Sequence, residues 1–475
     1  MTPPSPPQAP QSGAGPAALP PLSGGTTGPD ALRPLLATVL DALRDGAADR
    51  RGPLPAGGPG AVAARVRAAA EPVLPEHGTG GGEALRRLVH TLAHGTADPA
   101  DPLCAAHLHT PPLALAVAAD LAASALNPSL DSWDQAPAAS ELEAALTAAL
   151  AAEIYPSSAA PTGPAAVLTT GGTESNQLAL LLAREAHHPG LRTVCSAGTH
   201  HSVRRAAWLL GLPEPVVCPG EGLDPAELEA ALTLTPGPHL VIATAGTTDT
   251  GLIDPLPAIA DRCARHGAEL HVDAAYGGGL LFSARHRDRL AGLERADSVT
   301  FDLHKLGWQP IAAGLLAVAD RTRLAPLSLT VDYLNPDDDT ESGLPDLLGR
   351  SLRTTRRADA LKIAVTLRAL GRDGLGALVD RVLATAGELA ALIERNPALE
   401  LWERPALTTV LLRPAGAGDA DIARIRRTLL TDGTAVLGRA RAGGRLWLKA
   451  TVLNPHTTTA DLTRLTALVE GSNPG

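Results

Sequence analysis

Residues 165–187 read AAVLTTGGTESNQLALLLAREAH and combine a strand, a turn and a helix. The apolar and β-branched residues 165–170 predict a buried strand, and residues 175–187 predict an amphipathic helix. Two glycines in the turn allow a ligand to approach the backbone closely. The free N–H groups at the start of the helix attract an anion. Gly172 and Thr173 are therefore placed to hold a phosphate group.

The same alternation of strand and helix continues along the chain. This spacing predicts an α/β fold whose mostly parallel sheet is covered by helices on both faces. Further strands are expected at residues 240–246, 269–275, 298–303 and 314–319, with a helix at residues 255–266.

Longer amphipathic helices follow residue 357 and predict a smaller α+β domain. Its helices are expected at residues 358–370, 375–394 and 420–431, and its strands at 407–412 and 447–451. The first 30 residues are rich in Pro, Gly, Ser and Ala and cannot bury enough apolar surface to become ordered. The predicted division is a disordered tail (1–30), a helical segment (31–104), a large domain (105–357) and a small α+β domain (358–475).

Composition restricts the classes of function. The formal charge of −10 argues against a nucleic-acid-binding surface, because such a surface needs clustered Lys and Arg. The four cysteines have no CxxC spacing, and no signal peptide or membrane-spanning stretch is recognisable. These features predict a cytoplasmic protein with reduced thiols, no metal ion, and no membrane or nucleic-acid partner.

Residues 297–305, DSVTFDLHK, form a predicted strand that ends in a polar turn with one lysine. Lysine is scarce in this chain, which has only Lys305, Lys362 and Lys449. A lysine at a strand end could be an ordinary surface residue. Other motifs at strand ends favour a catalytic role for Lys305, because they supply what a lysine-bound pyridoxal 5′-phosphate (PLP) requires.

A carboxylate follows the strand in residues 269–278, ELHVDAAYGG. A buried Asp273 is costly unless it is paired with a cation, and the protonated pyridine nitrogen of PLP is a suitable partner.

Two more motifs add a ring and hydroxyl groups. Residues 198–203, GTHHSV, supply His200, which could stack on the pyridine ring. Residues 244–248, TAGTT, place Thr247 at another strand end, where open α/β sheets bind ligands.

In this order, the motifs resemble those of the group II PLP-dependent amino-acid decarboxylases over residues 105–455. The resemblance implies a PLP-dependent transferase fold of type I, like that of aspartate aminotransferase, with a seven-stranded-type sheet. It also implies a homodimer with the active site at the subunit interface. The motifs are TTGGTESN (169–176), HHSV (200–203), TAGTT (244–248), HVDAAYGG (271–278) and DLHK (302–305).

The resemblance also implies residue roles. Lys305 would hold PLP as a Schiff base, Asp273 would pair with the pyridine nitrogen, and His200 would stack on the ring. His304 would lie beside the substrate and assist protonation. The implied cofactor-binding set is Gly172, Thr173, His200, Thr247, Asp273, Ala275, Asp302 and Lys305.

Three stretches are similar to the 2,4-diaminobutyrate decarboxylases and the siderophore-pathway lysine decarboxylases. They are ALNPSLDSWDQ (125–135), DYLNP (332–336) and SLRTTRR (351–357). This likeness favours lysine, ornithine or 2,4-diaminobutyrate as substrate, and a siderophore pathway, without fixing either.

Three residues are candidates for substrate contact, two of them where the chain departs from the aromatic amino-acid decarboxylases. Residues 343–349, GLPDLLG, lack the loop tyrosine of that group, and Tyr333 is the nearest one. Lys449 stands where that group has a carboxylate-binding arginine, although packing at the edge of the core is an equal alternative for it. Trp133 is the third candidate.

Several alternatives remain open at this point. Glutamate or an aromatic amino acid could be the substrate, and an aldehyde-forming or transaminating enzyme has the same fold. A PLP-binding regulatory protein without turnover is disfavoured, because no helix-turn-helix signal or basic face is recognisable. A nicotinamide dehydrogenase is excluded in practice by the lack of a strand–GxGxxG–helix unit.

Overall fold

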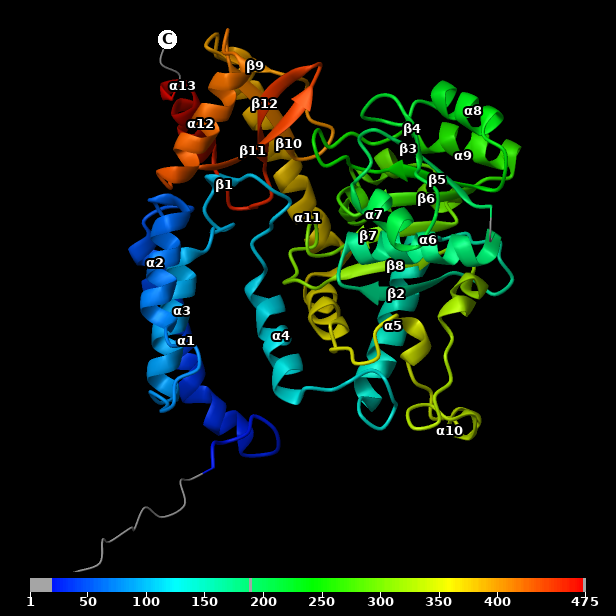
Figure 1. Ribbon diagram of the computed structural model, residues 1–475, viewed down its shortest axis with the longest axis horizontal. Coiled ribbons are helices and arrows are strands. Elements are labelled where there is room, and N and C mark those ends of the chain that lie inside the picture. Colours follow the sequence, from blue (N-terminus) through cyan, green and yellow to red (C-terminus); the bar gives the residue numbers. More distant parts are fainter. Residues whose placement is uncertain (1–18, 188–189, 473–475) are drawn as a thin grey trace, which may run out of the picture.

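A seven-stranded sheet forms the centre of the protein (Figure 1). The computed structural model describes residues 19–187 and 190–472. Within them, the strand order of this sheet is β2-β8-β7-β6-β5-β3-β4, and only β8 runs antiparallel to its neighbours. The predicted α/β class and mostly parallel sheet are confirmed. The strands are β2 (Ala165–Thr169), β3 (Arg192–Ser196), β4 (Val216–Cys218), β5 (His239–Thr244), β6 (Glu269–Ala274), β7 (Ser298–Asp302) and β8 (Gly314–Val318).

Helices cover both faces of this sheet, as the alternation of strands and helices predicts. Alternate residues of a strand point to opposite faces. Val167 of β2 packs in one cluster with side chains of α6, whereas Leu168 packs in another with side chains of α5. In the same way, α7 packs on one face of β5 and α9 on the other. The helices are α5 (Pro137–Ile154), α6 (Gly172–His187), α7 (Ser202–Leu209), α8 (Pro225–Leu234) and α9 (Leu256–His266).

A second, five-stranded sheet forms the smaller unit, with strand order β1-β11-β12-β10-β9. Its first strand comes from the N-terminal part of the chain, where Cys104 and Ala105 pair in parallel with Val436 and Leu437. Its elements are β1 (Cys104–Ala105), β9 (Leu399–Leu401), β10 (Thr409–Pro414), β11 (Val436–Ala442), β12 (Arg445–Thr451), α12 (Asp419–Thr431) and α13 (Thr459–Gly471).

One long helix, α11 (Ala360–Arg395), connects the two units. Gly371 interrupts it with a φ of 64°, a backbone conformation that glycine adopts without steric cost. The two helices predicted for this region therefore correspond to the two parts of α11. The remaining short elements are α10 (Asp337–Glu341), η1 (Gly277–Phe282), η2 (Arg287–Leu290), η3 (Leu293–Arg295), η4 (Arg321–Leu327) and η5 (Leu348–Arg350).

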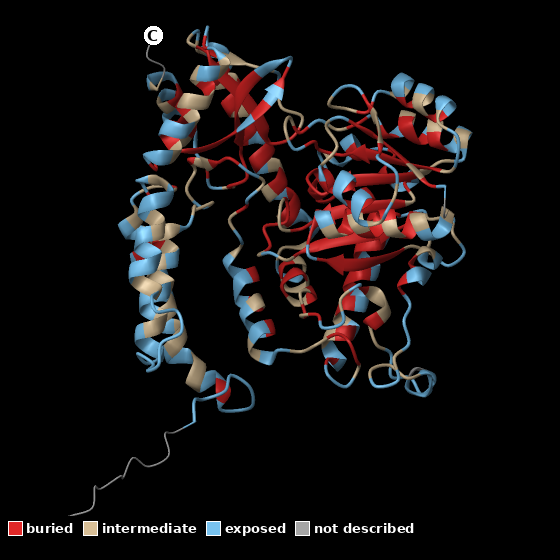
Figure 2. Cartoon of the chain, in the orientation of Figure 1, coloured by how far each residue is buried: buried red, intermediate tan, exposed pale blue. Residues whose placement is uncertain are grey.

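The N-terminal helices are much less buried than the sheets (Figure 2). They are α1 (Gly28–Arg50), α2 (Gly58–Ala70) and α3 (Gly81–Gly95), and α4 (Ala114–Leu126) leads from them to the large sheet. Helix α1 begins two residues before the predicted end of the tail, and residues 1–18 of that tail lie outside the described residues. The predicted domain boundaries stay a prediction. No helix among the described residues is long and apolar enough to cross a membrane.

A buried ion pair fixes the segment that leads into α11. Arg356 Nη1 lies 2.8 Å from Glu143 Oε1 on α5, and both side chains are at most 3% exposed. Burial raises the pKa of Glu143, and Arg356 opposes that rise. Removing one partner of such a pair leaves an uncompensated group in the interior.

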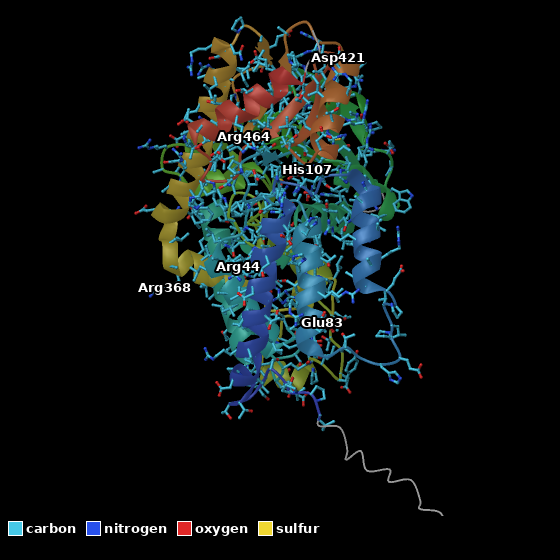
Figure 3. All side chains as sticks on the ribbon, turned by 90° about the vertical axis from the view of Figure 1, so that its left-hand side faces the viewer. Arg44, Glu83, His107, Arg368, Asp421 and Arg464 are labelled. Carbon is cyan, nitrogen blue, oxygen red and sulfur yellow. The ribbon has the colours of Figure 1, made fainter. Side chains whose placement is uncertain are left out.

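We expect Arg356→Met to lower the free energy of unfolding by about 3–5 kcal/mol, because the Glu143 carboxyl loses its partner. Urea unfolding of the apoprotein measures this change. Replacing both residues, by Glu143→Leu with Arg356→Met, should recover much of the loss. Arg44→Ala, in an exposed ion pair on α1, is the surface control (Figure 3). An Arg356→Met variant as stable as the parent would contradict the stabilising role of this ion pair.

Candidate active site

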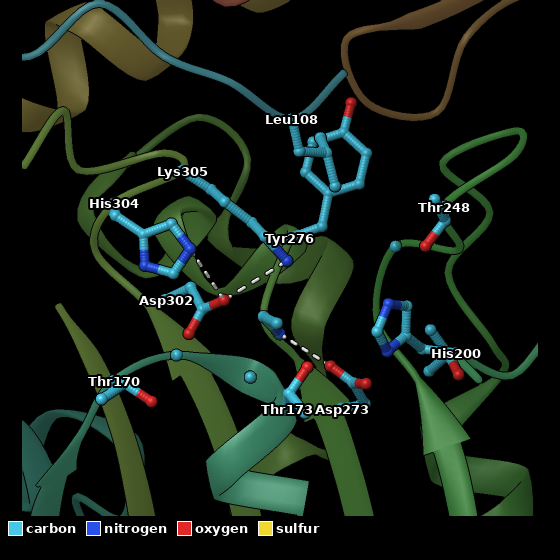
Figure 4. Close-up of a pocket in the computed structure, with 15 residues that line it drawn as sticks. Leu108, Thr170, Thr173, His200, Thr248, Asp273, Tyr276, Asp302, His304 and Lys305 are labelled. Atoms are coloured by element: carbon cyan, nitrogen blue, oxygen red, sulfur yellow. Dashed lines mark hydrogen bonds and ion pairs between the residues drawn. The ribbon is translucent and has the colours of Figure 1, made fainter. Parts of the chain in front are cut away.

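A cavity of about 400 Å³ lies where β5, β6 and β7 end and α6 begins (Figure 4). The carboxyl ends of parallel strands meet at one edge of the sheet, so motifs far apart in the chain converge there. Most of the predicted site residues line this cavity. They are Gly172, Thr173, His200, Asp273, Ala275, Asp302, His304 and Lys305.

Lys305 and His304 share one carboxylate, at the end of β7. Lys305 Nζ lies 3.3 Å and His304 Nε2 lies 3.4 Å from Asp302 Oδ2. The Thr110 hydroxyl donates to the backbone carbonyl of Lys305 over 3.0 Å and helps to fix the turn. Desolvation lowers the pKa of His304, so the ring is neutral near pH 7. Asp302 is 2% exposed, and its Oδ1 has no hydrogen-bond partner among the described residues.

Asp273 offers a buried carboxylate without a protein cation. Its Oδ2 accepts a hydrogen bond of 2.7 Å from Asn176 Nδ2, and its Oδ1 accepts one of 3.1 Å from the backbone N–H of Ala275. Asp273 is 5% exposed and makes no ion pair with the described residues. A cationic group of a ligand would complete its environment.

His200 stands on the opposite side of the cavity from Lys305 (Figure 4). Its Nδ1 lies 2.8 Å from the hydroxyl oxygen of Ser202, at the start of α7. Burial is the main cause that lowers the pKa of His200. The ring is therefore neutral near pH 7 and available for stacking on a flat ligand.

The N-terminus of α6 supplies the anion-binding end of the cavity. A Cβ added to Gly172 would lie 3.0 Å from Ala275 Cβ and 3.2 Å from Asp302 Oδ2, so only glycine fits there without displacement. Glu174 accepts hydrogen bonds from the N–H and hydroxyl groups of Thr170 and closes the turn. The partial positive charge of the helix end favours a phosphate at this place.

These groups suit PLP. The helix N-terminus with Gly172 and Thr173 would hold the phosphate, and Asp273 would meet the ring nitrogen. His200 would lie against the ring, and Lys305 is the amine that reaches the cavity.

Thr247 and Lys449 do not line the cavity. The Thr247 hydroxyl donates to Glu221 Oε1 over 2.7 Å, whereas Thr244 and Thr248 line the cavity in its place. Lys449 Nζ donates to the carbonyl of Thr248 over 3.0 Å and lies 3.2 Å from Asp249 Oδ1. It fixes the turn beside the site, which supports the structural alternative for this lysine.

Tyr333 and Trp133 also lie outside the cavity lining. The Tyr333 side chain is 80% exposed, in the segment before α10. Trp133 is half-buried between α4 and α5. Their roles in substrate binding stay a prediction.

The sequence reasoning missed the residues behind the cavity wall. Asn176, Ser202, His271 and Thr300 are fully buried and are linked by hydrogen bonds behind Asp273. Asn176 stood in the glycine-rich motif, four residues after Gly172. That spacing is one helical turn, which could have indicated that both face the same side. Leu108 and Tyr276 also line the cavity. Leu108 lies outside the quoted motifs, whereas Tyr276 stands in HVDAAYGG but was given no role.

The comparisons with known proteins agree with this geometry. The model of the pyridoxal-dependent decarboxylase conserved domain matches residues 69–414. The L-2,4-diaminobutyrate decarboxylase of Rhizobium meliloti (strain 1021) is 44% identical over an alignment of 406 positions, which covers 81% of this chain and 80% of that protein.

Two solved structures share the fold over nearly their whole length. One is the glutamate decarboxylase domain of the diaminobutyrate-pyruvate transaminase and L-2,4-diaminobutyrate decarboxylase from Vibrio parahaemolyticus. Its TM-score is 0.82 and its sequence identity is 31%. The superposition covers 95% of this chain and 97% of the Vibrio chain. The other is Oryza sativa TDC with PLP and tryptamine, with a TM-score of 0.84 at 26% identity over 94% and 99% of the two chains.

We expect Gly172→Ala to raise the dissociation constant for PLP about tenfold, which is about 1.4 kcal/mol. The added methyl group must displace Ala275 or Asp302. Equilibrium dialysis of the apoprotein against PLP measures the effect. Gly387→Ala on α11 is the matched control, because its Cβ would meet nothing within 4 Å. Equal affinities of the two variants would contradict a phosphate site at Gly172.

The lowered pKa of His200 predicts a dependence of stability on pH. Below the ordinary value of 6.5, the unfolded chain binds a proton that folded His200 does not, so acidification favours unfolding. His200→Gln should therefore lose less stability than the parent between pH 7 and pH 5.5. Urea midpoints of the apoproteins at both pH values measure this difference. His77→Gln, at an exposed histidine, controls for the removal of a ring. Equal losses of stability in the parent and in His200→Gln would contradict a neutral His200.

Proposed function

We propose that this chain, which belongs to the family of pyridoxal-dependent decarboxylases, converts a diamino acid to a diamine and CO₂. Family membership makes it a carboxy-lyase that depends on PLP. The observation that carries the proposal is the convergence of Lys305, Asp273 and the α6 N-terminus on one cavity.

Each side chain has a definite task in this proposal. Bound PLP supplies a ring that accepts the electron pair of the breaking bond between Cα and the carboxylate. The carboxylate of Asp273 keeps a proton on the ring nitrogen by electrostatic attraction. Lys305 Nζ is the nucleophilic amine that would hold the cofactor in the cavity.

The other groups of the cavity would control protons. Asp302 Oδ2 lies within 3.4 Å of both Lys305 Nζ and His304 Nε2, so it can hold the proton that Lys305 releases. His304 is neutral and faces the cavity, which suits proton delivery to the product carbon. His200 excludes water from one face of the ring and keeps it in place.

The cavity lining does not suit a substrate with an acidic side chain. Among its described lining residues, Lys305 is the one Lys or Arg, and it is assigned to the cofactor. A substrate with an acidic side chain would meet no free cation there. The 44% identity to a protein named L-2,4-diaminobutyrate decarboxylase supports this substrate before lysine or ornithine. A siderophore pathway is proposed on the family resemblance of residues 125–135.

A homodimer with the active site at the interface is part of the proposal. Apolar side chains are exposed on α1, on α3 and on α4, where packing against a second chain would bury them. They are Leu40, Leu43, Leu88, Leu92, Leu115, Val117, Leu121 and Leu126. The proposed location is the cytoplasm, which suits the four cysteines that the structure leaves as free thiols.

Product analysis tests the function directly. The holoenzyme is incubated separately with 2,4-diaminobutyrate, lysine, ornithine, glutamate and tyrosine, while CO₂ and amine are measured by mass spectrometry. We expect CO₂ and 1,3-diaminopropane from 2,4-diaminobutyrate in equal amounts. Turnover of glutamate or tyrosine alone would overturn the diamino-acid substrate. Aldehyde with ammonia, or oxygen uptake, would instead indicate the aldehyde-forming chemistry.

Lys305→Ala should abolish turnover and remove the absorbance of lysine-bound PLP, because no other lysine lines the cavity. Absorbance spectra and CO₂ release measure both effects. Lys449→Met removes a lysine that fixes the neighbouring turn, and it should keep the absorbance. Retention of absorbance and turnover in Lys305→Ala would refute the assignment.

A further inference from the structure

A buried amide links two walls of the cavity. Asn176, on the first turns of α6, is fully buried and does not line the cavity. Its Nδ2 donates to Asp273 Oδ2 over 2.7 Å and to the hydroxyl oxygen of Ser202 over 2.9 Å. Both amide hydrogens are therefore used, one toward each wall.

The carbonyl side of the same amide is also satisfied. Asn176 Oδ1 accepts from the Thr300 hydroxyl over 2.7 Å and lies 3.1 Å from His271 Nε2. All four hydrogen-bonding positions of the amide have partners. A rotated amide would turn its oxygen toward Asp273, which in its charged form can only accept. The carboxylate therefore fixes the orientation of Asn176.

This orientation sets the tautomer of His271. Because Asn176 Oδ1 accepts, His271 Nε2 carries the proton, and its Nδ1 accepts from the Ser298 hydroxyl over 2.8 Å. Burial lowers the pKa of His271, so the ring is neutral. Among the described residues, the side chains that are hydrogen-bonded behind Asp273 are therefore uncharged.

The other branch reaches His200. The Ser202 oxygen accepts from Asn176, so its hydroxyl hydrogen is free to donate to His200 Nδ1, 2.8 Å away. A ring that accepts at Nδ1 is neutral and has its proton on Nε2. One amide thus determines the hydrogen bonding of both Asp273 and His200.

We propose that Asn176 is a positioning residue that orients the Asp273 carboxylate toward the cofactor ring and, through Ser202, fixes the hydrogen bonding of His200. A hydrogen bond to the charged form of a carboxylate stabilises that form. The inference rests on the proposed function for the presence of PLP, and it is independent of which amino acid is the substrate.

Asn176→Asp tests the proposal at nearly constant side-chain volume. At pH 8, the new carboxylate would face Asp273 and repel it, so we expect PLP to bind at least tenfold more weakly than in the parent. At pH 6, one shared proton would restore a donor between the two carboxyl groups, and the affinity should recover. Equilibrium dialysis of PLP at both pH values, with absorbance titration of the bound cofactor, measures this.

Two further variants separate positioning from general destabilisation. Asn454→Asp alters an amide that is 7% exposed and donates to the carbonyl of Ala100, and it should leave PLP affinity unchanged at both pH values. Ser202→Ala removes the hydroxyl group that links Asn176 to His200 and leaves the hydrogen bond between Asn176 and Asp273 in place. It should change PLP affinity less than threefold, and the pH titration of the bound cofactor's absorbance should shift from that of the parent.

The outcomes decide the proposal in each case. Two results would overturn the proposal. One is a PLP affinity of Asn176→Asp within twofold of that of the parent at both pH values, and the other is a loss of PLP affinity that does not recover at pH 6. If Asn176→Asp does not fold, Asn176→Ala replaces it and should weaken PLP binding tenfold at both pH values, and unchanged binding would overturn the proposal. A parent that binds PLP normally but releases no CO₂ would refute the proposed function alone.

Discussion

The Asp273 carboxylate, buried at the end of β6 without a protein cation, is the constraint on which the rest of the site depends. A buried charge needs hydrogen bonds and an opposite charge. The protein supplies two N–H donors, from Asn176 and Ala275, and leaves the opposite charge to a ligand. The cationic ring nitrogen of the proposed cofactor would offset the cost of burying Asp273.

The large sheet is what makes this arrangement possible. The strands β5, β6 and β7 are parallel, so their carboxyl ends deliver Thr244, Asp273 and Asp302 to one edge. Helices on both faces bury the strands, and the N-terminus of α6 points at the same edge. A negative phosphate and a positive ring nitrogen can therefore be held at opposite ends of one cavity.

The histidines of the site are kept neutral by their surroundings. Desolvation lowers the pKa of His200, of His271 and of His304. Neutral rings can stack, accept or donate without adding positive charge near Lys305. Among the described residues that line the cavity, Lys305 is the one lysine.

Much of this could be predicted from the sequence, because local patterns report local structure. The strands around residues 165–170 and 298–303 are rich in apolar and β-branched residues, and each leads into a polar motif that lines the cavity. Strands β3 and β4 were not predicted, because β3 carries polar residues and β4 has only three residues. Gly371 separated two predicted helices that the structure joins as α11.

The sequence by itself determined the fold class and the cofactor, and it predicted Lys305 and Asp273 as site residues. Each of these depends on a residue type at a strand end, and strand ends are visible in the apolar pattern. Only the tertiary structure decided which neighbours point inward. In the structure Thr247 donates to Glu221, and Lys449 pairs with Asp249. Asn176 lies behind Asp273 and donates to it. Such contacts join residues up to 200 positions apart, and hydrophobic periodicity carries no information about them.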